Sequence, residues 1–268
     1  MAKTANETVT GELIKKRAMQ DGADIVGIAP AERLQDEPEG TRPTDLLPGA
    51  KAVISVGMRQ LRAYMESAPS TNYFMFGYRQ KNDYVSTICA DIAAMLDKEG
   101  YYALPVPSWG AADLIISHGK AEMRGIFSNA RAAAVAGLGE MGLSGLFLSS
   151  VYGPRIWLGS VITTAPLTAD PPFSDKLCDR ENCRECIKQC PANAIGEDGV
   201  LNAVDCVIAC DKLHTSYDET VKQMLERQET VDPLVRIGQA VGYTDYKGYG
   251  FCGLACINAC PVGKKELV

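Results

Sequence analysis

The sequence predicts a mixed fold, α/β or α+β, followed by a cysteine-rich C-terminal domain. Three observations support this division. Helical and strand patterns alternate in the first part, nine cysteines fall between Cys178 and Cys260, and prolines gather in the segment 166–176 between the two parts. We therefore expect one domain at residues 1–170 and a second at residues 171–268.

The first part begins with alternating helical and strand patterns. Apolar residues at helical spacing predict a helix with one buried face, which a glycine can end: Leu13, Ile14, Ala18 and Gly22. The same spacing from Val85 to Leu96 predicts a longer helix that Gly100 ends. Short apolar or β-branched runs predict strands at residues 24–29, 52–56, 101–106, 114–117 and 155–164. Strands that alternate with helices in this way are typical of α/β folds.

An alanine-rich helix leads into a glycine-dense loop. Ser128 can act as its N-cap, the helix is expected to reach Ala136, and Gly137 can end it in the left-handed conformation. The next residues spell GLGEMG, but a dinucleotide fingerprint must follow a strand and open a helix, whereas this string follows a helix. Two interpretations remain open. The loop is a helix stop with a tight turn, or its glycines form one wall of a pocket for a large flat ligand: Gly137, Gly139, Gly142 and Gly145.

Charge and composition narrow the choice of partners and compartment. The chain has 268 residues, with 27 basic and 33 acidic side chains and a net charge of −6, and it has no basic block, so we expect no nucleic-acid partner. It shows no signal-peptide core, no twin-arginine pair and no apolar stretch of membrane-spanning length, which predicts a cytoplasmic protein without a membrane partner. In that reducing compartment, cysteines are expected to bind metals or clusters and not to form disulfides.

The cysteines fall into two motifs, each of which ends in Cys-Pro. The first motif is CDRENCRECIKQCP, at residues 178–191, and the second motif is CGLACINACP, at residues 252–261. A [4Fe-4S] cluster needs four converging thiolates, and in two-cluster ferredoxins the cysteine before proline ligates the other cluster. Four cysteines can also bind zinc, but the doubled Cys-Pro ending favours two clusters.

This pattern predicts a ligand set for each cluster. The first cluster takes three cysteines of the first motif and the last cysteine of the second motif: Cys178, Cys183, Cys186 and Cys260. The second cluster takes the remaining motif cysteines and one from the chain between the motifs: Cys190, Cys206, Cys252 and Cys256. We prefer Cys206 to Cys210 because it lies just beyond the short segment 199–205. Cys89 lies on the apolar face of a predicted helix, so we expect a buried structural thiol.

The stretch ARAAAVAGLGEMGLSGLFLSSVYGPRIWLGSVITTAPL, from Ala130 to Leu167, resembles the epoxyqueuosine reductases and corrinoid-dependent reductive dehalogenases. The resemblance continues through both cysteine motifs to Val262. It implies a nitroreductase-like N-terminal domain and a bacterial-ferredoxin-like domain with two clusters. It also implies base-off cobalamin on the glycine loop, near one cluster, at Gly137, Leu138, Gly139, Gly142 and Tyr152. Where epoxyqueuosine reductases place an aspartate proton donor, this chain offers Glu122 and no aspartate.

These expectations combine into an iron-sulfur oxidoreductase that works under anaerobic conditions. Electrons would pass from a reduced ferredoxin or flavodoxin through both clusters to cobalamin, which would reduce a small-molecule substrate. The sequence identifies no catalytic residue, and Tyr152 and Asn129 are candidate proton donors because they flank the glycine loop. The alternatives are a non-catalytic electron-transfer or corrinoid-handling protein, or a flavin in place of cobalamin. The sequence leaves the oligomeric state open, with a homodimer as one option.

Overall fold

The computed structural model describes residues 10–67, 72–108, 112–117, 120–202, 205–206 and 254–264. The helical elements in these residues are α1 (Gly11–Gln20), η1 (Ala31–Leu34), α2 (Pro43–Leu46), α3 (Arg62–Glu66), η2 (Tyr73–Gln80), α4 (Lys81–Lys98), α5 (Asn129–Val135), α6 (Glu185–Lys188) and α10 (Ala255–Ala259). The strands are β1 (Ile25–Pro30), β2 (Ala52–Arg59), β3 (Ala103–Val106), β4 (Ala112–Ser117), β5 (Lys120–Gly125), β6 (Gly139–Met141), β7 (Phe147–Ser149) and β8 (Ile156–Thr163).

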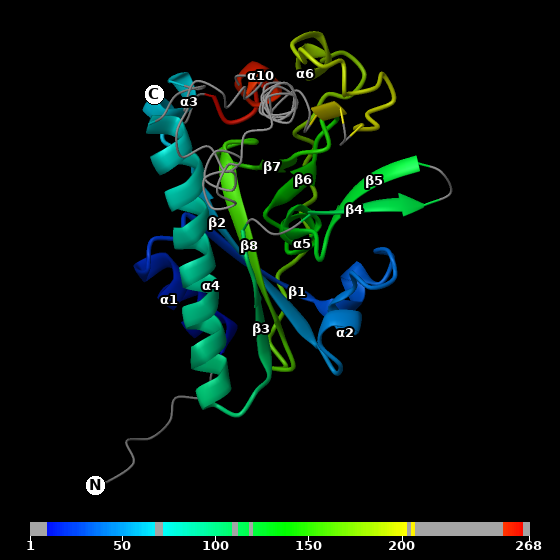
Figure 1. Ribbon diagram of the computed structural model, residues 1–268. Coiled ribbons are helices and arrows are strands. Elements are labelled where there is room, and N and C mark those ends of the chain that lie inside the picture. The colour runs from blue at the N-terminus through cyan, green and yellow to red at the C-terminus, as the bar shows by residue number, and fades with distance from the viewer. Residues whose placement is uncertain are drawn as a thin grey trace, which may run out of the picture.

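A four-stranded antiparallel sheet supports the N-terminal part, with the strand order β1-β2-β8-β3. Strand β2 pairs with β8 from Ala52 opposite Thr163 to Arg59 opposite Ile156, so segments far apart in sequence lie side by side. Figure 1 shows α4 running along one face of this sheet, with α5 on the other side. Since both faces are covered, the side chains of β2 alternate between two cores, and every residue of the strand except Arg59 is buried.

Two hydrophobic clusters fill these two faces. In the first, Ile54 of β2 packs with Ile14 of α1 and Ile92 of α4, and all three are fully buried. In the second, Val53 packs with Ala132 of α5. Each fully buried isoleucine or valine side chain stabilises the fold by roughly 1.5–3 kcal/mol. The apolar face of each helix thus fixes its position on the sheet.

Cys89 belongs to the first of these clusters. Its side chain is fully buried, which confirms the prediction of a structural thiol. Burial raises the pKa of the Cys89 thiol to about 12. The sheet approaches this thiol closely, because a Cβ on Gly159 would lie 2.8 Å from the Cys89 sulfur.

Most elements lie where the sequence predicts them. The first helix, the long helix, the alanine-rich helix and the β-branched strand correspond to α1, α4, α5 and β8, while β2 runs three residues beyond its predicted end, to Arg59. Ser128 caps α5, since its Oγ accepts a hydrogen bond from the Arg131 amide at 3.2 Å. Gly137 follows α5 with a φ of 80°. Strand β5, which forms a hairpin with β4, was not predicted. Within the described segments, no helix combines the length and the apolar character needed to cross a bilayer.

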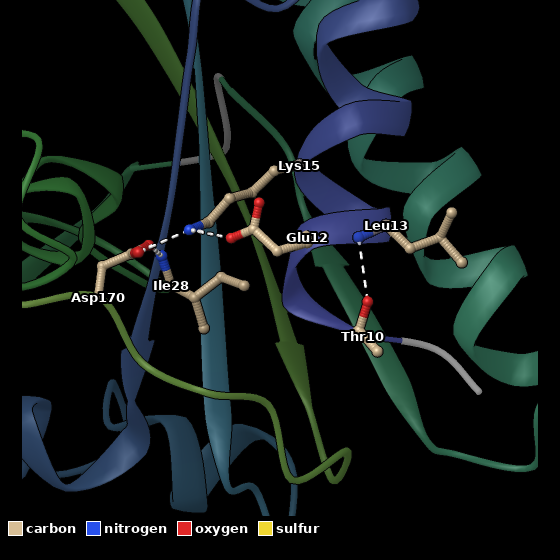
Figure 2. A network of polar contacts seen from close by, with 6 residues as sticks. All are labelled: Thr10, Glu12, Leu13, Lys15, Ile28 and Asp170. Carbon is tan, nitrogen blue, oxygen red and sulfur yellow. Dashed lines mark hydrogen bonds and ion pairs between the residues drawn. The ribbon is translucent and has the colours of Figure 1, made fainter. Parts of the chain in front are cut away.

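The predicted boundary segment is strapped to the edge strand β1 by Asp170 (Figure 2). The Asp170 amide donates to the Ile28 carbonyl at 2.8 Å, and the Asp170 carboxylate accepts hydrogen bonds from the Ile28 amide at 2.8 Å and Lys15 Nζ at 2.6 Å. Burial alone would lower the Lys15 pKa, but the hydrogen bond and charge of Asp170 raise it above its ordinary value. Arg33 also donates to the Asp170 carbonyl at 2.9 Å. These contacts, which we call the Asp170 strap, satisfy backbone groups at an open sheet edge.

Candidate metal-cluster site

Cysteines from both motifs line one cavity of about 80 Å³. Its four cysteines are Cys178, Cys183, Cys186 and Cys260. Cys186 lies on α6 and Cys260 directly follows α10, and these two short helices contact each other. Figure 1 shows both helices at the same end of the sheet, beside β6 and β7. The rest of the wall is largely apolar, with Leu143 and Leu148 among its side chains.

A second cavity, of about 50 Å³, is lined by three further cysteines: Cys190, Cys206 and Cys256. Apolar side chains complete its described wall, among them Ile195 and Leu201. Two cysteines named in the sequence analysis, Cys252 and Cys210, lie outside the described residues.

Each cavity therefore combines cysteines from both motifs. The cysteine before proline in the first motif, Cys190, lies with Cys256, while the one in the second motif, Cys260, lies with Cys178. Within the residues described, no group of three or more His, Cys, Asp or Glu side chains is arranged to hold a metal ion. The ligation of clusters by these cysteines stays a prediction.

The glycine-dense segment folds into the β6–β7 hairpin and packs tightly against the chain itself. A Cβ on Gly137 would lie 2.2 Å from the Pro171 carbonyl oxygen, and one on Gly139 would lie 1.9 Å from the Leu148 carbonyl oxygen. Both glycines have positive φ, 80° and 157°. Gly137 thus serves as the helix stop, and Gly139 opens β6 with its backbone packed closely against β7.

The other residues predicted at the cofactor have different surroundings. Leu138 and Tyr152 are partly buried and pack in one cluster with Phe147. Gly142 lines the first cysteine cavity. Of the two candidate proton donors, Asn129 donates from Nδ2 to the Pro107 carbonyl at 2.8 Å, and its buried Oδ1 has no partner among the described residues.

The turn of the β6–β7 hairpin lies between the two cysteine cavities. Leu143 lines the first cavity, Leu146 lines the second, and Ser144 lines both. The Leu143 amide donates a hydrogen bond to the Cys178 sulfur at 3.4 Å. In the second cavity, the amide of Ala194 donates to the Cys190 sulfur at 3.3 Å. Such N–H···S bonds favour negative charge on sulfur and are one way in which proteins tune cluster potentials.

Glu140, between the glycines of the loop, fastens the first motif to the hairpin. Its carboxylate accepts hydrogen bonds from the amides of Leu177, at 2.7 Å, and Cys178. Sequence reasoning missed this function, and the available signal was a single carboxylate inside an otherwise apolar GLGEMG string. Arg180 of the first motif makes a second contact with the hairpin, because its guanidinium donates a hydrogen bond to the Met141 carbonyl.

Arg155, at the start of β8, makes the corresponding contact with the second motif. Its guanidinium donates to the carbonyls of Val262 at 2.8 Å, Ile257 at 2.9 Å and Cys260 at 2.7 Å. The backbones also meet closely here, because a Cβ on Gly153 would lie 2.1 Å from the Val262 oxygen. The YGPR segment is therefore the docking point of the second motif on the sheet.

The surroundings shift the pKa of two thiols in the first cavity, Cys186 and Cys260. Burial raises the pKa of Cys186, and the Ile187 amide partly offsets this effect. Burial also raises the pKa of Cys260, whereas a backbone hydrogen bond from Val262 and the charge of Arg155 lower it. Metal ligands must be thiolates, so loading this cavity with metal releases protons.

Sequence comparison relates the chain to two kinds of reductase. It is 25% identical over 207 residues to the epoxyqueuosine reductase of Synechocystis sp., which covers 77% of this chain and 65% of that protein. It is 28% identical over 221 residues to the tetrachloroethene reductive dehalogenase of Sulfurospirillum multivorans, which covers 80% of this chain and 36% of that protein. The homologues of this chain are epoxyqueuosine reductases and reductive dehalogenases. No protein-family model matches the chain.

Solved structures from both groups share the fold. The epoxyqueuosine reductase from Streptococcus thermophilus has a TM-score of 0.59 at 17% identity and covers 94% of this chain and 66% of that one. A reductive dehalogenase linked to B12-dependent dehalogenation has a TM-score of 0.57 at 20% identity, and the match covers 100% of this chain and 39% of that one. The predicted family resemblance and the mixed α/β fold class are thus confirmed. The chain spans between 36% and 66% of the length of these relatives.

A third structure bears on the expected partners. It is an epoxyqueuosine reductase with a tRNA stem loop, which matches with a TM-score of 0.60 at 17% identity over 95% of this chain. The expectation of no nucleic-acid partner conflicts with this finding. The reason is physical, since net charge sums over the whole chain whereas RNA contacts depend on local charge. A net charge of −6 therefore does not exclude RNA.

Proposed function

We propose that this chain is an iron-sulfur oxidoreductase that holds two [4Fe-4S] clusters and passes electrons through them to a second redox cofactor. The observation that carries the proposal is the exchange of Cys-Pro cysteines between the two cavities, because two-cluster ferredoxins exchange these ligands in the same way. The relatives' names support the reaction class, since both groups are reductases.

The proposed ligands follow from the cavity linings and the motif spacing. In the first cavity they are Cys178, Cys183, Cys186 and Cys260. In the second they are Cys190, Cys206 and Cys256, together with Cys252 from the second motif. The cavities suit an anionic cluster because backbone amides donate to two of the sulfurs and a buried cation lies beside the first cavity.

For the acceptor of these electrons we propose cobalamin, held by the domain at residues 1–170 beside a cluster domain at residues 171–268. A relative linked to B12-dependent dehalogenation supports this choice. A bound corrinoid would supply the chemistry that reduces a small-molecule substrate. Because Gly137 and Gly139 are packed on the chain's own carbonyls, the proposed contacts that remain are Leu138 and Gly142 in this loop and Tyr152 after β7. Reduced ferredoxin or flavodoxin is the proposed electron donor.

Titration with cob(II)alamin tests the corrinoid assignment. The anaerobically reconstituted chain should convert added cob(II)alamin to its base-off spectrum, with micromolar or tighter affinity. Tyr152→Phe removes only a hydroxyl and should disturb the fold little. Gly139→Val is the more disruptive variant, because its side chain would collide with the Leu148 carbonyl and disturb the hairpin. Stoichiometric flavin with no change in the cob(II)alamin spectrum would exclude cobalamin and leave the cluster proposal standing.

A further inference from the structure

Arg155 is a charged side chain in an almost fully buried position. Only 3% of its surface is exposed, at the point where β8 begins and the second cysteine motif docks. All three hydrogen bonds given above for its guanidinium end on backbone carbonyls, two in that motif, at Ile257 and Cys260, and one directly after it, at Val262. The guanidinium therefore holds the backbone before, at and after Cys260.

The charge of Arg155 has no carboxylate partner among the described residues. The ion pairs found there join other side chains, such as Lys15 with Asp170 and Arg131 with Glu37. Neutral carbonyls satisfy the N–H groups of Arg155, but they leave a buried positive charge uncompensated, which is costly unless an anion lies nearby.

A cluster in the first cavity would be that anion. Four thiolates give a [4Fe-4S] centre a net negative charge, which grows by one when the centre is reduced. A fixed positive charge in a poorly solvated position stabilises the more negative state more strongly. Arg155 contacts the backbone of Cys260, which lines the first cavity together with Asp179 and Glu185, whereas the described lining of the second cavity consists of apolar side chains, cysteines and Ser144.

On the basis of the proposed function, we propose that Arg155 is a positioning residue for Cys260 that also raises the reduction potential of the cluster in the first cavity relative to the other. The charge of Arg155 would act more strongly on the cluster in the first cavity, because the guanidinium bonds the carbonyl of the ligand Cys260 itself and, for the second cavity, only that of Ile257 beside Cys256. An electron shared between the two clusters would then reside mainly on the cluster in the first cavity.

A redox titration of the full chain monitored by electron paramagnetic resonance tests this inference. After anaerobic reconstitution, Arg155→Gln removes the charge and keeps an amide donor, whereas Arg155→Lys keeps the charge and loses the fork of donors. The matched control is Arg33→Gln, because Arg33 also donates to two backbone carbonyls, those of Val135 and Asp170, away from the cysteines. Iron and sulfide content is measured for every variant.

We expect Arg155→Gln to shift the midpoint potential of one cluster to more negative values and to shift the other less. Arg155→Lys should stay close to the wild type, and Arg33→Gln should shift neither cluster. Unchanged potentials in a fully loaded Arg155→Gln protein would overturn the inference. If Arg155→Gln cannot hold the cluster, Arg155→Lys decides: cluster loading with both midpoint potentials close to the wild type supports the charge effect, and a clearly more negative potential in loaded Arg155→Lys overturns it. A wild-type chain without two cluster signals would instead refute the proposed function, and this inference with it.

Discussion

At the scale of single residues, the thiols of this chain fall into two chemical classes. Cys89 is fully buried, and its pKa is raised to about 12, whereas the cysteines of the two cavities are only partly buried. After iron is removed with a chelator, iodoacetamide near pH 8 should therefore alkylate the motif cysteines and spare Cys89 until denaturant is added. Peptide mass spectrometry reads this pattern directly. Labelling of Cys89 at the rate of the motif cysteines in folded protein would contradict its burial.

The raised pKa of Cys89 also links stability to pH. Its folded-state pKa of about 12 exceeds the ordinary value of 9.0, so its contribution is complete below about pH 9 and is lost as the pH rises toward 12. The loss is at most about 1.4 kcal/mol per pH unit for one proton. The difference in free energy of unfolding between wild type and Cys89→Ala should therefore shrink above pH 9. A difference that stays constant up to pH 11 would argue against the shift.

Two alanine variants separate a cluster ligand from a bystander. Cys206 lines the second cavity with Cys190 and Cys256, so Cys206→Ala should reduce the signal of one cluster. Cys210→Ala is the matched control, four residues further along the chain, and should keep both signals. The opposite result, with loss only in Cys210→Ala, would show that the eighth ligand was assigned wrongly.

Glu140 allows a test of how the first motif is held. Glu140→Ala leaves the amides of Leu177 and Cys178 without their acceptor, which should lower the free energy of unfolding by about 1–3 kcal/mol. Glu140→Gln keeps an acceptor oxygen and should lose less. Urea unfolding and iron retention measure both effects, and equal behaviour of the two variants would show that the hydrogen bonds are not what matters.

At the scale of elements, the Asp170 strap holds the segment between the two parts against β1. Asp170→Ala removes the acceptor of both the Ile28 amide and Lys15, and it should cost about 1–3 kcal/mol of unfolding free energy. Asp170→Asn keeps an acceptor for the amide and should cost less, and Lys15→Met isolates the ion pair. Denaturant titrations decide the order, and an Asp170→Ala protein as stable as the wild type would mean that the strap contributes little.

The sequence predicted most of the elements because their periodicity and end signals are local. Helix α5 is an example, since Ser128 caps it and Gly137 follows it with positive φ, as expected. The order of strands was beyond such reasoning. The pairing of β2 with β8 joins residues 52–59 to residues 156–163, and no local signal encodes that partnership.

The sequence predicted the cysteines of the candidate site but not the other residues that contact them. The spacing of the two motifs grouped Cys260 with the first motif, and these cysteines line one cavity. Glu140, Leu143 and Arg155 were missed because their effects depend on tertiary contacts made by backbone amides and carbonyls. The glycine string illustrates the opposite limit, since a pattern typical of ligand loops is used at Gly137 and Gly139 for close packing.

At the scale of the whole molecule, the sheet domain and the cysteine motifs meet at three described points. The β6–β7 turn separates the two cavities, Glu140 fastens the first motif, and Arg155 fastens the second. The segments proposed to bear the clusters are thus fixed to the part of the chain proposed to hold the electron acceptor. Short and rigid connections of this kind suit electron transfer, because they keep redox centres at constant separation.

The central claim is that the chain holds two cubane clusters, and iron and sulfide analysis tests it most directly. Protein reconstituted and desalted under anaerobic conditions should contain about eight irons and eight sulfides per chain, as two [4Fe-4S] clusters require. Cys260→Ala and Cys190→Ala should each lower that content, because each removes a ligand proposed for a different cluster. A wild-type value near four irons, or stoichiometric zinc without sulfide, would contradict the claim.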